Sequence, residues 1–206
     1  MVLAYLRENP STSFTLRNLG ARLPQWLAAH PEFAPRNHRL ALDVARLEWA
    51  YVEAFDSTAA NALRVSDLQS LNADSTLSLQ PHLQLLDLLY PVDDLVLAVH
   101  KNVPHGGITS HGVSQRKRRV RLRLPGIRRT AIFLAVHRYQ DAVYYRRIDR
   151  QQFLMLVALK QEHSLAAAIE AAFAGTRVSA EERVRRIREY FAHASELGWF
   201  CPRQPS

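Results

Sequence analysis

The sequence predicts an α+β protein that is mainly helical, with a helical N-terminal domain followed by a C-terminal winged-helix-like module of three strands and then three helices. Three observations lead to this prediction. One long amphipathic helix pattern dominates the first half, a Gly-, Pro- and Arg-rich stretch follows it, and strand patterns precede helix patterns in the second half. We therefore place the N-terminal domain at 1–100, a linker at 101–119 and the module at 120–200.

The long helix is written LALDVARLEWAYVEAF, from Leu40 to Phe55. Its apolar residues recur in steps of four, three, four and four, which is the period of one helical face. We expect that face to point into the core, with a charged border that includes Arg46 and Glu48. The core face consists of Leu40, Val44, Leu47, Tyr51 and Phe55.

Shorter elements surround this helix. Gly20 and Pro24 interrupt helix patterns at 2–7, 15–19 and 23–30. Strand patterns at 76–79 and 82–88 flank Pro81, and a helix is expected at 92–100. The N-terminus is too short and too soon interrupted by Pro10 for a signal peptide.

The second half alternates apolar and basic residues at Val120–Leu124, as a half-exposed strand does. Thr130–Val136 reads as a buried strand, 139–142 as a turn and Val143–Ile148 as the third strand. Helices are expected at 150–162, 165–174 and 180–197. Ser164 caps the second, Ser179 and Glu182 form a capping box for the third, and the core face of the third is Val184, Ile187, Phe191 and Ala194.

The net charge of +8 has one source. The stretch 115–129 contains eight basic residues and no acidic one, and the remaining 19 basic residues balance 19 acidic ones. Such a stretch suits phosphate or an acidic surface, although a solvated loop is the commoner case for a short run of charge. The candidate polyanion-binding residues are Arg116, Lys117, Arg118, Arg119, Arg121 and Arg123.

No catalytic motif is recognisable, so we expect neither an enzyme nor a bound cofactor or metal. The nine histidines are scattered. His100, His105 and His111 fall in the Gly-rich linker, which lacks the rigid support of a metal site. His82 and His137 lie on expected strands, where packing or hydrogen bonding is the usual role. The single Cys201 and the lack of an apolar run of ~18 residues favour a cytoplasmic protein without a membrane segment.

A peptide site is predicted on the third strand of the module. Tyr144 and Arg146 share one face of that strand, and Val143 and Tyr145 share the other. If the strand lies at an edge, an extended peptide could add to it, and Arg185 and Arg188 of the last helix would form a second wall. The alternative is that these arginines belong to a solvated helix face, offset by neighbouring glutamates.

Four ordered segments carry a resemblance to a known family: DVARLEWAYVEAFD, SLQPHLQLLDLLYPV, LAVHRYQDAVYYRRID and SLAAAIEAAF. Together they resemble a bacterial family named for a DNA-binding domain, which includes the partner subunits of methanobactin and bufferin biosynthesis. The resemblance extends from near Met1 to about Trp199. Relative to that family, Met1 falls inside the N-terminal domain, so a truncated or misassigned start is expected.

The resemblance implies a non-catalytic partner protein. Such subunits pair with an iron-dependent TIM-barrel oxygenase and help to present the leader of a small ribosomal precursor peptide, and the iron belongs to the oxygenase. The competing expectation is a DNA-binding protein, such as a transcriptional regulator, that uses 116–129. That segment has no interleaved aromatic residues for base stacking, which counts against this alternative.

Overall fold

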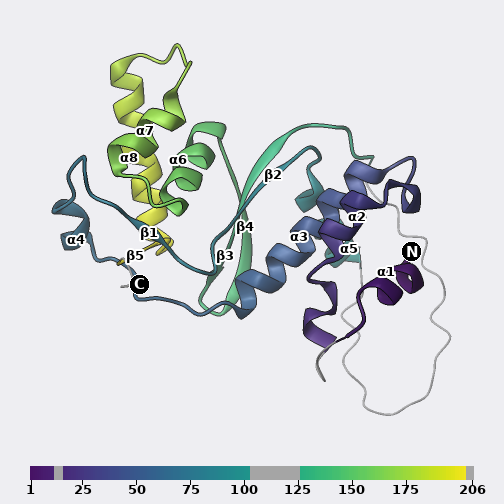
Figure 1. The fold of residues 1–206 in the computed structure, drawn as a ribbon. Coiled ribbons are helices and arrows are strands. Elements are labelled where there is room, and N and C mark those ends of the chain that lie inside the picture. The colour runs from purple at the N-terminus through teal and green to yellow at the C-terminus, as the bar shows by residue number, and fades with distance from the viewer. Residues whose placement is uncertain (12–15, 103–125, 203–206) are drawn as a thin grey trace.

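The computed structural model describes residues 1–11, 16–102 and 126–202 (Figure 1). It confirms a mixed α+β architecture with antiparallel sheets. Its elements, in chain order, are α1 (Val2–Glu8), η1 (Leu16–Gly20), α2 (Leu23–Ala29), η2 (Pro31–Phe33), α3 (His38–Asp56), α4 (Val65–Gln69), β1 (Ser78–Leu79), β2 (Gln84–Leu88), α5 (Val92–Asn102), β3 (Ile132–Tyr139), β4 (Ala142–Ile148), α6 (Arg150–Lys160), α7 (Leu165–Phe173), α8 (Ala180–Glu196) and β5 (Phe200–Cys201).

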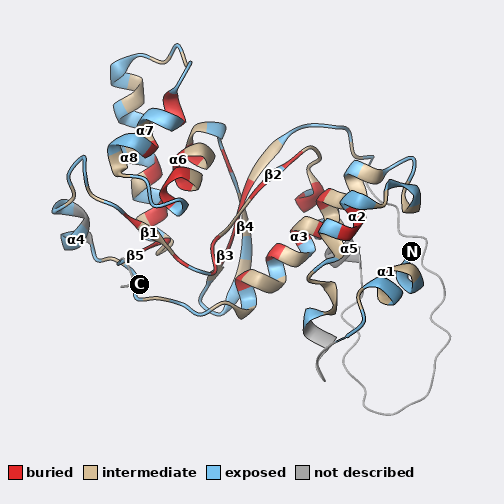
Figure 2. Ribbon diagram, in the orientation of Figure 1, coloured by how far each residue is buried: buried red, intermediate tan, exposed pale blue. Residues whose placement is uncertain are grey.

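The central sheet has the strand order β2-β3-β4 and lies between two groups of helices (Figure 1). Helices α3 and α5 cover one face, where Leu134 and Val136 of β3 are buried. The other face meets the group of α6, α7 and α8 through Phe133 and Ala135. Because β3 is covered on both faces, its sequence is a continuous apolar run rather than an alternating one (Figure 2).

Helix α3 meets the sheet with a different stripe from the predicted one. Leu47, Ala50 and Ala54 are buried against the sheet, whereas Tyr51 is 38% exposed and Phe55 is 53% exposed. The expectation that both aromatic residues face the core is therefore wrong. The alternative stripe has the same helical period, and its two alanines let the helix axis come close to the strands.

The C-terminal helices form within two residues of their predicted ends, because their start signals are local. The side chains of Asp149, Ser164 and Ser179 accept backbone N–H groups at the N-termini of α6, α7 and α8. Val184 is 48% exposed, so its predicted place in the core of α8 is wrong, and Tyr190 is buried instead. The chain then returns as β5 to pair with β1.

The sheet joins the two halves of the chain. Strand β2 precedes the predicted linker and β3 follows it, yet they pair along their length from Gln84 opposite Val136 to Leu88 opposite Ile132. Both sides of β3 are thereby occupied, by β2 and by β4. The strand predicted at Val120–Leu124 lies outside the described residues.

The N-terminal helices pack on the outer side of α3. Tyr5, Trp26 and Leu27 form a small buried cluster with Ala45 of α3. The indole nitrogen of Trp26 donates to the Glu8 carboxylate at 2.8 Å and so links α2 to the end of α1. No helix in the described ranges is long and apolar enough to cross a membrane.

Candidate functional site: the outer edge of the sheet

The register of β4 is set by a two-residue turn. Tyr139 pairs with Ala142, and the residues between them, Gln140 and Asp141, have φ values of 47° and 62°. Positive φ at both central positions is typical of a type I′ turn, whose twist matches that of the flanking strands. Asp is among the residues that tolerate this conformation best, which explains how RYQDAV forms a tight hairpin.

The turn also determines which backbone groups of β4 point outward. In a two-residue hairpin the flanking pair is hydrogen-bonded, and such pairs then alternate along the ladder. Tyr144, Arg146 and Ile148 therefore bond to β3, opposite His137, Ala135 and Phe133. The N–H and C=O groups of Val143, Tyr145 and Arg147 face away from the sheet. We call these outward backbone groups the open edge.

The opposite edge of the sheet, on β2, is capped by side chains. Arg46 of α3 donates to the Asp87 carbonyl oxygen at 2.7 Å, and Lys160 of α6 donates to the Leu83 carbonyl oxygen at 3.2 Å. At the C-terminal end of β2, a carboxylate oxygen of Asp43 accepts the N–H groups of Leu89 at 2.7 Å and of Tyr90 at 3.1 Å. Side chains thus satisfy the outward groups at both ends of β2, which is one way in which proteins protect an edge strand.

Asp43 can cap this edge although it is buried. Its side chain points to the end of β2 and lies 3.7 Å from the Arg46 guanidinium. Burial raises the pKa of Asp43, while the two backbone N–H groups and the nearby arginines act in the opposite direction. The sequence placed Asp43 outside the core stripe. Its partners lie more than forty residues away, so no local signal identifies it.

No equivalent cap reaches the open edge from any residue in the described ranges: no hydrogen bond to the outward groups of Val143, Tyr145 or Arg147 is found there. The strand is long enough, at seven residues, to template another strand. An exposed edge with unpaired donors and acceptors can bind an extended peptide by main-chain hydrogen bonds.

The open edge has an aromatic border on the α3 side. The ring of Tyr51 lies 6.3 Å from that of Tyr145, edge to face, and the guanidinium of Arg138 donates to the Phe55 carbonyl oxygen at 2.5 Å. Arg138 is the residue opposite Val143, so the main chain of Phe55 lies at the hairpin end of β4. The last turns of α3 indeed run beside the hairpin in Figure 1. We call Tyr51 and Phe55 the aromatic ledge.

The other end of β4 is held by an ion-pair cluster. The Arg147 guanidinium binds the buried Asp93 carboxylate through two hydrogen bonds, of 2.7 and 2.9 Å, and Asp94 at 2.7 Å. Hydrogen bonding to these carboxylates raises the pKa of Arg147. Both acids lie in the first turn of α5, where the helix dipole favours negative charge. This cluster fixes the β4 side chain that faces α5 and leaves the backbone edge accessible.

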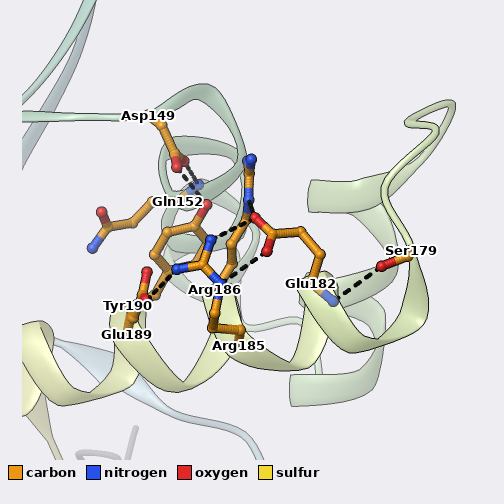
Figure 3. Close-up of polar contacts among 8 residues, drawn as sticks. All are labelled: Asp149, Gln152, Ser179, Glu182, Arg185, Arg186, Glu189 and Tyr190. Carbon is orange, nitrogen blue, oxygen red and sulfur yellow. Dashed lines mark hydrogen bonds and ion pairs between the residues drawn. The ribbon is translucent and has the colours of Figure 1, made fainter.

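Helix α8 contributes less to the site than expected. Tyr190 donates to Asp149, the residue after β4, at 2.5 Å, and this contact anchors α8 at the end of the strand (Figure 3). Arg185 binds Glu182 and Glu189 of its own helix at 2.8 and 2.7 Å. Hydrogen bonds from Arg185 and Arg186 lower the pKa of Glu182 to about 2. Arg185 is thus held by glutamates on its own helix, and Arg188 lies exposed further along it.

The remaining predicted site residues divide into two groups. Tyr144 is 48% exposed, and with Arg146 it lines the face of β4 opposite the aromatic ledge. The residues predicted to bind polyanions, from Arg116 to Arg123, lie outside the described residues. Of the same basic stretch, Arg128 and Arg129 are described, and both are exposed where the chain leads into β3.

The buried histidines have structural roles, as expected. His82 accepts the Arg138 backbone N–H through Nδ1 at 3.2 Å and so extends the pairing of the β2 segment with β3. His137 packs edge to face on Trp199, with ring centroids 5.2 Å apart. Burial lowers the pKa of His137 to about 4. Burial also raises the pKa of the Cys201 thiol, and no cluster of three metal-ligating side chains occurs among the described residues.

Comparison with known proteins does not extend this description, because no family model and no curated protein matches the chain.

Proposed function

We propose that this chain is a non-catalytic partner protein that binds a precursor peptide through the open edge of β4. In this proposal the peptide is the leader of a ribosomally made product, and an iron-dependent TIM-barrel oxygenase is the second partner. The observation that carries the proposal is the difference between the two edges of the sheet: side chains cap both ends of β2, while the outward groups of β4 remain available.

Strand addition is the recognition mode that fits this edge. Main-chain hydrogen bonds to Val143, Tyr145 and Arg147 would supply affinity that does not depend on the peptide sequence, and neighbouring side chains would supply selectivity. The rigid hairpin and the Arg147 cluster hold the edge in one conformation, so little ordering of the protein is needed on binding.

The identity of the partners comes from the sequence resemblance described above. The segments that carry the resemblance include α3 and β4, the elements that flank the open edge. The winged-helix-like arrangement belongs to the same proposal: the β3–β4 hairpin followed by α6, α7 and α8 would form the peptide-recognition module, and β2 would complete its sheet. The reactive iron would belong to the oxygenase, and this chain would position its substrate in the cytoplasm.

The competing function is DNA binding by the basic stretch 116–129. The exposed Arg128 and Arg129 favour contact with a polyanion, and they are separate in sequence from the open edge. The two functions therefore predict different effects of substitutions. A change in the basic stretch should weaken DNA binding and reduce its salt dependence, and a change in the open edge should weaken peptide binding.

The test is calorimetric titration of the full chain with the leader peptide encoded by the precursor gene beside this gene. Val143→Pro removes one outward N–H of the open edge without removing a bond to β3, and we expect it to weaken peptide binding at least about tenfold. Val184→Ser, a change at an exposed residue of α8, is the matched control and should bind as the wild type does.

Two results would contradict the proposal. One is a leader peptide that does not bind the wild-type chain. The other is a leader peptide that binds Val143→Pro, shown to be folded by circular dichroism, as tightly as wild type. Selective binding of one DNA duplex, lost on neutralising Arg116, Lys117, Arg118 and Arg119, would favour the competing function instead.

A further inference from the structure

The distance between the two residues of the aromatic ledge matches the distance between alternate residues of an extended peptide. Tyr51 and Phe55 are four residues apart in α3, which corresponds to a rise of about 6 Å along the helix. Residues that share one face of a strand are about 6.8 Å apart. Helix α3 runs along the sheet, since Asp43 meets the end of β2 and Phe55 meets the hairpin. Two alternate side chains of an added strand could thus rest on the two rings.

The two aromatic residues present apolar surface to solvent. Tyr51 and Phe55 are 38% and 53% exposed, while the smaller Ala50 and Ala54 beside them are buried. Their exposure follows from the way α3 packs on the sheet, so it places apolar surface next to unpaired backbone groups. This combination is typical of sites that bind apolar side chains of an extended partner.

The opposite face of β4 carries Tyr144, which is 48% exposed, and the charged Arg146. Arg146 has no ion pair within the described part of the chain. Its neighbour Arg147, in contrast, is bound by Asp93 and Asp94. An added strand directs the side chain opposite Arg146 to the same face as Arg146. An acidic side chain at that position would complement the unpaired guanidinium.

We propose that the open edge selects a strand in which apolar and acidic residues alternate. This inference rests on the proposed function and specifies the class of peptide that the edge binds. Apolar residues opposite Val143 and Tyr145 lie on the aromatic ledge, and the acidic residue opposite Arg146, next to the one opposite Tyr145, pairs with Arg146. The α3 ledge, rather than the arginines of α8, is the wall that reads the peptide.

A second copy of this chain fits the edge less well. Pairing of two β4 strands about Tyr145 would set each Arg146 opposite Tyr144 of the other copy. The two Arg146 side chains would then lie on one face at a diagonal separation of about 7–8 Å, with no acid between them. An acidic peptide relieves this repulsion, which favours the peptide as the occupant.

The test uses two synthetic peptides of about nine residues, slightly longer than the seven-residue β4. The first alternates Leu and Asp, and the second has the same composition in two blocks; both carry fluorescein. By fluorescence anisotropy we expect the alternating peptide to bind the full chain about tenfold more tightly, because only it directs Leu and Asp to opposite faces.

Two substitutions test which residues of the protein contact the apolar and the acidic face of the bound peptide. Phe55→Ser should weaken the alternating peptide about fivefold, and Arg146→Glu should weaken it similarly and restore binding to an alternating Leu–Lys peptide. Val184→Ser and Arg188→Glu, which change comparable exposed residues on α8, should leave the affinity unchanged. Restored binding of the Lys peptide is a result that general destabilisation could not produce.

The outcomes separate this inference from the proposed function. Equal binding of the two Asp peptides would overturn the inference. So would unchanged affinity in Phe55→Ser and Arg146→Glu, if Val143→Pro abolishes binding. Either result would still be compatible with strand addition at the open edge. A dimer that persists in sedimentation when the alternating peptide is added would also overturn it, in favour of a second copy. Failure of every peptide, including the genomic leader, would overturn the proposed function itself.

Discussion

The two edge strands of the central sheet, β2 and β4, differ in whether side chains form hydrogen bonds with their outward backbone groups. On β2, side chains from three residues, Asp43, Arg46 and Lys160, reach groups at both ends of the strand. On β4, the side chains nearest the edge pair with other side chains instead, as Arg147 does with Asp93 and Asp94. Both strands lie under the same helices, so the difference arises from which side chains those helices carry rather than from the topology.

This difference shows that protection of an edge is a property of individual side chains. The β2 side of α3 presents Arg46, whereas the β4 side presents Tyr51 and Phe55, which have no charged group that can reach a carbonyl oxygen. Helix α3, which lies wholly within the described residues, thus caps the β2 edge with the Arg46 side chain and presents no donor that reaches the β4 edge, which stays available to a partner.

The largest expected effect concerns the helix that both edges share. Leu47→Ala removes a fully buried side chain between α3 and the sheet, and should lower the free energy of unfolding by ~2–5 kcal/mol. Phe55→Ala removes a larger but exposed side chain and should cost no more than about 0.5 kcal/mol. Urea denaturation of both variants measures the difference, and equal losses would show that α3 does not face the sheet with Leu47.

The next effect tests which groups of β4 point outward. Tyr144→Pro removes an N–H that bonds to β3 opposite His137, and should cost about 3 kcal/mol. Val143→Pro removes an outward N–H and should cost less than half as much, because no ladder bond is lost. A larger loss for Val143→Pro than for Tyr144→Pro in chemical denaturation would reverse the assignment of the open edge.

Local patterns predicted much of the fold. The capping residues Ser164 and Ser179 start their helices in the sequence as in the structure, and the RYQDAV segment turns where expected. The stripe of α3 could not be chosen in this way. Leu47 belongs both to the predicted stripe and to the observed one, and only the approach of the sheet decides between them.

The candidate site was predictable only in part. The sequence pattern identified a strand at Val143–Ile148, but only the structure shows that this strand lies at an edge of the sheet. The aromatic ledge was missed because Tyr51 and Phe55 fitted a core stripe equally well. Glu182 and Glu189 lie three and four residues from Arg185, a spacing at which helical side chains meet. The sequence therefore already allowed the alternative that Arg185 belongs to a solvated helix face offset by glutamates.

A third expected effect is a pH dependence of the unfolding free energy, which arises on the β2 side of the sheet. His82 and His137 lie where the β2 segment meets β3, and the pKa of His137 is lowered from 6.5 to about 4 by burial. The unfolded chain then binds a proton that the folded chain does not, so stability is complete above pH 6.5 and falls as the pH approaches 4. We expect a loss of about 2 kcal/mol between pH 7 and pH 5.

Denaturation of the wild type at these two pH values measures this loss. His137→Phe, which keeps a ring against Trp199, should remove most of the dependence and leave the smaller contribution of His82, whose pKa is also lowered by burial. A pH dependence that survives in His137→Phe would show that His137 is not its source.

The smallest expected effect comes from removing side-chain caps of the β2 edge, so that it resembles the open edge of β4. Arg46→Met and Lys160→Met each remove one hydrogen bond to an outward carbonyl oxygen while keeping most of the apolar stem of the side chain. Together they should lower the unfolding free energy by only about 1 kcal/mol, because water can replace both donors. The double variant then keeps only the Asp43 cap on β2, and it should self-associate as the protein concentration rises, which sedimentation velocity detects. Arg188→Met is the control for the loss of an exposed guanidinium, and association in that variant as well would attribute the effect to charge rather than to the edge.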